Sequence, residues 1–317
     1  MDQPKILITG GTGFAGSHLI ENLLAQGYKD IYSTTFGSSN PSPQLLSSNH
    51  YLRVNLVDGA ATAQLFEHLK PNWVFHLASF AYVGKSFEKA AELFTNNIGL
   101  QMSVLEAVRI HTPTARVLTV GSAEEYGIVP SNVEKIDESC LLNPVNPYAV
   151  SKVTQDMLAG SYALSYKLNI IRARPFNHIG TRQTGDFAVP SFARQIVDIE
   201  QGKQQKLLVG NLSGVRDFTD VDDMAKAYIL LMEKGNPGEI YNIGSGINYV
   251  MSDVVKMLSS FATVPIPLEE DQTRLRPLDV PRLIADNKKI VSLGWQPTSD
   301  IKPALKNILE EWRKHSI

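Results

Sequence analysis

The sequence predicts an α/β fold: a doubly wound, parallel, Rossmann-like sheet with a smaller mixed α/β part at its C-terminal end. Short β-rich runs alternate with amphipathic helical stretches through the first half of the 317 residues. This alternation is typical of a parallel sheet covered on both faces by helices. A glycine-rich turn follows the first run, as in nucleotide-binding sheets. After Pro175 the loops lengthen and proline becomes frequent between residues 265 and 281, which indicates a different kind of structure.

Six runs in the first half are expected to be strands: Lys5–Thr9, Asp30–Thr34, Tyr51–Val54, Trp73–Leu77, Arg116–Val120 and Asn169–Arg174. The stretch Phe14–Gln26 is expected to be a helix, because its leucines share one face and Gly27 follows it. Two longer helices are expected at about 87–110 and 148–166. Their apolar residues extend beyond one stripe, so they pack on the sheet and are predicted to pair in a homodimer.

Composition and charge argue against several classes of protein. The net charge of −2 offers no basic excess for nucleic acid, and no apolar run approaches the ~20 residues of a membrane span. The single Cys140 and the absence of a signal-peptide pattern predict a cytoplasmic location. The acids Asp220, Asp222 and Asp223 are interpreted as a helix start rather than a metal site. No metal is therefore expected.

The first glycines have the spacing of a nucleotide cradle. Gly10, Gly13 and Gly16 follow a predicted strand and open a predicted helix. Missing side chains let the backbone approach a pyrophosphate, and the helix N-terminus supplies amide donors. The alternative is a tight strand–helix turn without a ligand. The predicted contacts with the dinucleotide here are Gly10, Thr12, Gly13, Phe14, Ala15 and Gly16.

The end of the second predicted strand bears on the choice of cofactor. It reads Tyr32-Ser-Thr-Thr-Phe36 and lacks the acid that usually binds the ribose hydroxyls of NAD. Thr35, Phe36 and Ser38 are predicted contacts there, which favours NADP(H), although no arginine is present and NAD(H) stays open. Asn55 and Leu56 are predicted to contact adenine, with an ordinary turn as the alternative.

A tyrosine and a lysine stand one helical turn apart at Tyr148 and Lys152. Residues four apart lie on one helix face, and a neighbouring ammonium is expected to lower the pKa of a phenol. Ser122 follows a predicted strand and adds a hydroxyl. Each residue alone is explained by ordinary structure. Together with the cradle, they indicate hydride transfer.

These motifs resemble the extended short-chain dehydrogenase/reductases, which act largely on nucleotide sugars. The resemblance covers nearly the whole chain and rests on five motifs: Gly10-x-x-Gly13-x-x-Gly16, Asn96-x-x-Gly99, Gly121–Gly127, Tyr148-x-x-x-Lys152 and Arg174-Pro-Phe-Asn177. Segments 174–180, 209–221 and 275–281 look most like the GDP-sugar branch. This branch includes 4-keto-6-deoxy-sugar reductases and GDP-mannose 4,6-dehydratases.

The resemblance implies reduction of the C4 ketone of GDP-4-keto-6-deoxy-D-mannose to GDP-D-rhamnose. Tyr148 would donate the proton, Lys152 would hold the nicotinamide ribose, and Ser122 would bind the carbonyl oxygen. Ala123 stands where dTDP-glucose dehydratases carry an aspartate, but Glu124 matches the dehydratase base. A dehydratase or a 4-epimerase therefore stays an alternative. A non-catalytic dinucleotide-binding protein is a third, less favoured one.

The family pattern also implies a division of the chain and further binding residues. Residues 1–174 would bind the dinucleotide, with a strand near 239–243 rejoining the sheet, and residues 175–317 would mainly bind the GDP-sugar. Bidentate pairing suits arginines to the diphosphate. Further implied cofactor contacts are Leu77, Ala78, Asn96, Tyr148, Lys152 and Pro175. The implied substrate contacts are Ser122, Glu124, Asn177, Val189, Arg216, Arg276 and Asp279.

Overall fold

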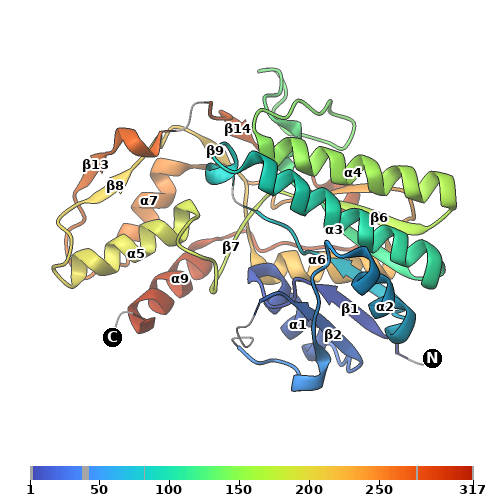
Figure 1. The fold of residues 1–317 in the computed structure, drawn as a ribbon. Coiled ribbons are helices and arrows are strands. Elements are labelled where there is room, and N and C mark those ends of the chain that lie inside the picture. Colours follow the sequence, from blue (N-terminus) through green and yellow to red (C-terminus); the bar gives the residue numbers. More distant parts are fainter. Residues whose placement is uncertain (1–2, 38–42, 82, 276–277, 316–317) are drawn as a thin grey trace.

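The computed structural model describes residues 3–37, 43–81, 83–275 and 278–315, which form a large sheet part and a smaller part beside it (Figure 1). The large part has a seven-stranded parallel sheet. In spatial order its strands are β11 (Ile240–Ile243), β6 (Asn169–Pro175), β5 (Arg116–Val120), β4 (Trp73–His76), β1 (Ile6–Thr9), β2 (Ile31–Thr35) and β3 (Tyr51–Arg53). The strand order reverses between β1 and β4, which confirms the predicted doubly wound fold.

The central strands β1 and β4 form where the sequence is mostly apolar. β1 reads Ile-Leu-Ile-Thr and is buried at every position, as expected for a strand covered on both faces. Ile6 lies opposite Ile31 on one side and Trp73 on the other. At the far edge, Ile240 of β11 lies opposite Arg172 of β6, so a late segment completes the sheet.

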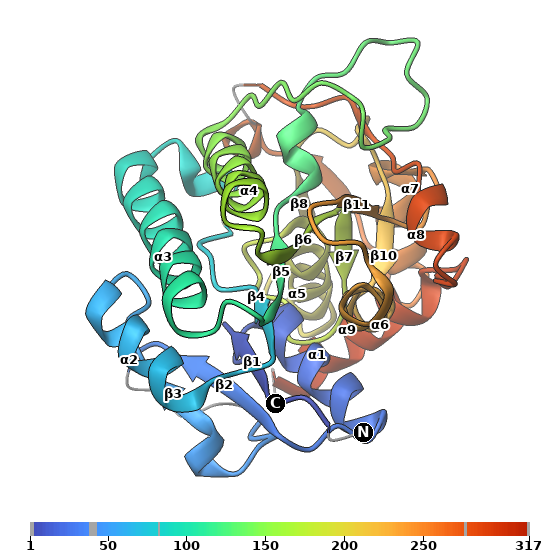
Figure 2. The same ribbon diagram turned by 90° about the vertical axis from the view of Figure 1, so that its right-hand side faces the viewer.

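Helices cover the two faces of the sheet (Figure 2). One face packs against α1 (Phe14–Ala25) and α6 (Val221–Lys234), and α8 (Lys288–Val291) lies beside β11. The other packs against α2 (Gly59–Leu69), α3 (Ala90–His111) and α4 (Pro147–Tyr166). Four 3₁₀ turns are described: η1 (Ser48–His50), η2 (Gly84–Ser86), η3 (Ala123–Tyr126) and η4 (Gln272–Arg274).

Side-chain caps explain where two of these helices begin. The Asn146 side chain accepts the N–H of Ala149 at 2.8 Å, and Pro147 occupies the first turn of α4. The Asp220 carboxylate accepts the N–H of Asp222 at 2.8 Å at the start of α6. The prediction that the acids at 220–223 mark a helix start is therefore confirmed.

The smaller part contains α5 (Ala188–Glu200), α7 (Met251–Ser259) and α9 (Lys302–His315), packed around a separate apolar core. Its short strands are β7 (Asn177–Ile179), β8 (Leu207–Val209), β9 (Val215–Arg216), β10 (Phe218–Asp220), β12 (Tyr249–Val250), β13 (Leu268–Glu270) and β14 (Arg282–Leu283). Residues 175–317 are predicted to form mainly this part. Of the helices in that half, α6 and α8 pack with the large sheet. Across the described residues, no helix combines the length and apolarity that crossing a membrane requires.

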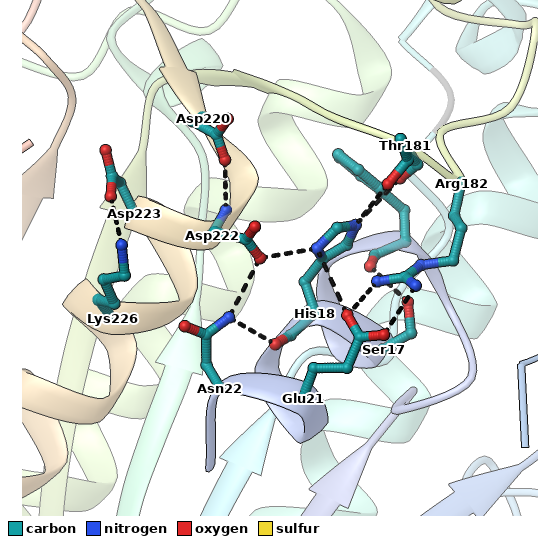
Figure 3. Close-up of polar contacts among 11 residues, drawn as sticks. Ser17, His18, Glu21, Asn22, Thr181, Arg182, Asp220, Asp222, Asp223 and Lys226 are labelled. Carbon is teal, nitrogen blue, oxygen red and sulfur yellow. Dashed lines mark hydrogen bonds and ion pairs between the residues drawn. The ribbon is translucent and has the colours of Figure 1, made fainter. Parts of the chain in front are cut away.

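A polar cluster joins α1 to α6 and to the segment between the two parts (Figure 3). The buried His18 of α1 lies 2.8 Å from the Asp222 carboxylate and 3.1 Å from the Thr181 carbonyl. Arg182, which has a φ of 68°, donates two hydrogen bonds to the Glu21 carboxylate, at 3.0 and 2.5 Å. Its backbone N–H donates to Glu311 of α9. These contacts hold α1 against the smaller part.

Candidate active site

A cleft of about 800 Å³ lies over the C-terminal ends of the parallel strands and extends into the smaller part. Ligands bind at this position in doubly wound sheets. All but two of the predicted site residues line the cleft: Gly10, Thr12, Gly13, Phe14, Ala15, Gly16, Thr35, Phe36, Asn55, Leu56, Leu77, Ala78, Asn96, Ser122, Glu124, Tyr148, Lys152, Pro175, Asn177, Val189, Arg216 and Asp279. The other two, Ser38 and Arg276, lie outside the described residues.

The glycine turn at one end of the cleft requires glycine at two positions. Gly10 has a φ of +72°, in the left-handed region. A Cβ on Gly16 would lie 2.3 Å from the Gly10 carbonyl oxygen and 2.6 Å from the Gly11 Cα. No side chain caps the start of α1 at Gly13, so its first amide groups remain for a ligand. This cradle fits the pyrophosphate of a dinucleotide.

The end of β2 presents no carboxylate to the cleft within the described residues. Thr35 is buried and lines the cleft, whereas Phe36 is largely exposed. The hydroxyl of the preceding threonine, Thr34, accepts the N–H of Gly10 at 3.2 Å, which ties this strand end to the glycine turn. Asn55 and Leu56 follow β3 on the same wall. A 2′-phosphate would meet no repelling charge from these side chains.

Ser122, Tyr148 and Lys152 come together on the cleft wall formed by β5, η3 and α4. The Ser122 hydroxyl oxygen accepts the N–H of Glu124 at 3.2 Å, and the Ser122 side chain is also hydrogen-bonded to Tyr148. The Lys152 ammonium donates to the Val120 carbonyl at 2.9 Å, and its Nζ lies 5.9 Å from the centre of the Tyr148 ring. All three side chains are buried except toward the cleft.

The pKa of Tyr148 is raised, whereas the spacing of Tyr148 and Lys152 predicted that it would be lowered. Burial is the largest effect and raises the pKa of Tyr148. The hydrogen bond with Ser122 lowers this pKa, whereas the carboxylates of Glu124 and Glu125 raise it. Burial also lowers the pKa of Lys152 to about 8. Desolvation therefore outweighs the attraction inferred from the four-residue spacing, and the phenol holds its proton.

Glu124, the residue that matches a dehydratase base, is half-buried at the cleft edge. Its carboxylate accepts a hydrogen bond from the Asn146 side chain at 3.1 Å. Because Asn146 also caps α4, Glu124 is tied to the start of the helix that carries Tyr148. This contact fits the reading of Glu124 as a hydrogen-bonding carboxylate.

The substrate end of the cleft pairs two residues that the sequence treated separately. Arg216 of β9 donates to the Asp279 carboxylate at 3.0 Å. The family resemblance implied that both contact the substrate, and paired donor geometry suits an arginine to the diphosphate. In the structure the two side chains form an ion pair, and both line the cleft. Asn177 and Val189 line the floor nearby.

Three further residues were missed by sequence reasoning. Arg274 lines the cleft two positions before the predicted Arg276. Tyr228 of α6 is buried and reaches the cleft, although its position in an apolar helix gave no functional signal. Asn97 is buried behind the wall, where it accepts the Phe80 N–H at 2.8 Å and donates to Ser151 of α4 at 3.2 Å. The adjacent Asn96 and Asn97 could not be told apart from sequence.

Among the described residues, no three His, Cys, Asp or Glu side chains gather as metal ligands.

Comparison with known proteins identifies the family. A family model described as GDP-mannose 4,6 dehydratase matches residues 7–308. The chain belongs to this family. The match confirms the resemblance to the extended short-chain dehydrogenase/reductases drawn from the motifs.

Individual relatives share the whole length of the chain. It is 31% identical to a GDP-6-deoxy-D-mannose reductase from Pseudomonas aeruginosa, over 97% of each protein. A solved structure of RMD from Pseudomonas aeruginosa complexed with NADPH superposes with a TM-score of 0.84 at 30% identity, covering 98% of this chain and 99% of that one. A UDP-glucose 4-epimerase from Thermus thermophilus with NAD gives a TM-score of 0.86 at 26% identity, covering 97% and 98%.

Proposed function

We propose that this protein reduces the C4 ketone of GDP-4-keto-6-deoxy-D-mannose with NADPH, forming GDP-D-rhamnose. One observation carries the proposal: Ser122, Tyr148 and Lys152 line the same cleft as the glycine cradle. The 31% identity to a GDP-6-deoxy-D-mannose reductase supports the choice of substrate. The absence of a carboxylate at the described end of β2 supports NADPH over NADH.

The residues of the chain divide the chemistry between them. NADPH held at the turn formed by Gly10, Gly13 and Gly16 would supply a hydride to C4 of the sugar. The Ser122 hydroxyl donates a hydrogen bond to the ketone oxygen, while its own oxygen keeps the hydrogen bond from the Glu124 N–H. Tyr148 transfers its phenolic proton to that oxygen, and its raised pKa keeps this proton in place until the substrate is bound. The ketone gains a hydride at carbon and a proton at oxygen and becomes an alcohol.

Lys152 stabilises the charge left on Tyr148. With its pKa lowered to about 8, the ammonium is still mostly protonated at pH 7. Its position one turn along the same face of α4 brings a positive charge to the phenolate as it forms. The arginine at position 216 is suited to the diphosphate by its planar donor geometry.

The experiment is incubation with NADPH and GDP-4-keto-6-deoxy-D-mannose, followed by NMR of the product. We expect NADPH oxidation with formation of GDP-D-rhamnose, and a loss of about 10² to 10⁴ in kcat for Tyr148→Phe. NADPH binding by this variant should be unchanged. No oxidation of either NADPH or NADH by the unmodified protein would reject the proposal.

A dehydratase is the second candidate, because Glu124 lies in the cleft. Its contact with Asn146 gives the carboxylate a structural role without proton abstraction, so we favour reduction. Conversion of GDP-mannose without added reductant would reverse this preference.

We further propose a homodimer through α3 and α4. The support is a group of exposed apolar side chains on these helices: Ile110, Val150, Met157, Leu164 and Tyr166. Leu164→Lys is expected to convert the dimer to a monomer in light scattering. A monomeric unmodified protein would contradict the proposal. The cytoplasmic location stays a prediction.

A further inference from the structure

A buried ionic cluster lies behind the catalytic wall and outside the cleft lining. Arg174 of β6, Glu125 of η3 and Asp156 of α4 are each at most 4% exposed. Charges shut away from water in this way are rarely retained for stability, since apolar side chains of similar volume often serve as well. Their arrangement therefore needs another explanation.

Arg174 touches two elements of the catalytic wall at once. Its Nη2 donates to the Asp156 carboxylate at 2.7 Å, and its Nε lies 3.1 Å from the Glu125 carboxylate. Its Nη1 donates to the Tyr126 hydroxyl at 3.0 Å. One rigid guanidinium thus contacts both η3 and α4, which a lysine ammonium cannot do with the same geometry.

Each contact leads to a segment that carries a catalytic residue. The second oxygen of Glu125 accepts the backbone N–H of Ser122 at 2.7 Å. Asp156 stands four residues after Lys152 and eight after Tyr148, on the same face of α4. A chain of contacts therefore connects the Ser122 turn to α4, the helix that carries Tyr148. It runs through Glu125, Arg174 and Asp156.

The turn at Ser122 is built tightly around Glu125. A Cβ on Gly121 would lie 2.2 Å from the Glu125 carboxylate oxygen. Burial, followed by the charge of Asp156, raises the pKa of Glu125 to about 8, while Arg174 and the Ser122 N–H act in the opposite direction. Arg174 and the Ser122 N–H thus oppose the rise in the pKa of Glu125, and the Glu125 side chain holds the turn through its hydrogen bond with the Ser122 N–H.

We propose that Arg174 is a positioning residue: it sets the place of the Ser122 hydroxyl relative to Tyr148 by holding η3 against α4. This inference rests on the proposed function, in which both hydroxyls meet one ketone oxygen. A shift of the Ser122 turn by about 1 Å lowers the rate by up to about 10²-fold without removing a binding contact.

The test compares Arg174→Lys with a matched control, Arg172→Lys. Arg172 lies two residues earlier in β6 and also contacts Asp156, at 3.3 Å, but no contact with Glu125 is recorded. We expect Arg174→Lys to lower kcat at least about tenfold, with KM for the GDP-sugar changed less than about twofold. Arg172→Lys should leave kcat unchanged. Full kcat in Arg174→Lys would overturn the proposal.

A double-mutant cycle separates positioning from a general structural role. If Arg174 acts through Ser122, then adding Arg174→Lys to the Ser122→Ala variant should lower kcat by less than about twofold relative to Ser122→Ala alone. Equal fold losses in both backgrounds would reject the coupling. Glu125→Gln, which keeps an acceptor for the Ser122 N–H, replaces Arg174→Lys in the same cycle if that variant does not fold.

Amide hydrogen exchange distinguishes failure of this inference from failure of the proposed function. Without any substrate, Arg174→Lys should speed exchange of the Ser122 amide at least about tenfold relative to Arg172→Lys. If the unmodified protein turns over no GDP-sugar, the proposed function fails and the exchange result alone decides. Unchanged exchange would overturn the positioning role.

Discussion

Replacing Lys152 by methionine should make the protein more stable while abolishing its activity. Lys152 is buried, and its ammonium has one recorded hydrogen bond, to the Val120 carbonyl. Burial lowers its pKa from 10.5 to about 8, so holding the charge in the folded state is unfavourable. Methionine has similar length and no charge to desolvate.

The expected magnitude follows from the pKa. The interval from 10.5 to about 8 corresponds to about 3 kcal/mol at 1.36 kcal/mol per pH unit. Loss of the hydrogen bond to Val120 offsets about 1 kcal/mol of this gain. We therefore expect Lys152→Met to raise the free energy of unfolding by about 2 kcal/mol at pH 7.

The sign of the pH dependence is specific. A lysine whose folded pKa is depressed destabilises the fold fully below the folded value of about 8, and this effect disappears as the pH rises to 10.5. The advantage of Lys152→Met should thus be constant up to about pH 8, then shrink. It should vanish near pH 10, where the remaining charge penalty of about 1 kcal/mol is cancelled by the lost hydrogen bond.

Urea denaturation at pH 7, 8, 9 and 10 measures this difference, since other titrating groups are common to both proteins. Lys256→Met, at an exposed site on α7, serves as control and should change the free energy of unfolding by less than about 0.5 kcal/mol. If Lys152→Met is less stable at pH 7, or if its advantage does not change with pH, the reasoning from burial fails.

Three further outcomes are expected from single substitutions. Gly16→Ala should weaken NADPH binding at least about 100-fold in a fluorescence titration, because its Cβ would lie 2.3 Å from the Gly10 carbonyl oxygen. Gly59→Ala should bind normally, because a Cβ there would make only an ordinary van der Waals contact, 3.7 Å from the Ser103 hydroxyl. Arg216→Met should raise KM for the GDP-sugar at least about tenfold with little change in kcat. An unchanged KM would show that the guanidinium does not bind the diphosphate. Glu124→Gln should retain NADPH oxidation within about tenfold, and a much larger loss would indicate that this carboxylate takes part in proton transfer.

The sequence by itself determined the features that are encoded within a few neighbouring residues. The apolar run of β1 and the glycine spacing predicted a strand, a turn and a helix, because each depends on local backbone preference and periodicity. The spacing of Tyr148 and Lys152 likewise determined that they share a face of α4.

Only the tertiary structure decided what surrounds these residues. The pKa of Tyr148 is raised because distant segments bury it, and no spacing along α4 contains that information. The pairing of Arg216 with Asp279 and the contacts of Arg174 join residues far apart in sequence. The packing of α6 against the sheet was missed for the same reason. Desolvation and ion pairing depend on which segments meet in space, whereas helix and strand patterns depend on neighbours along the chain.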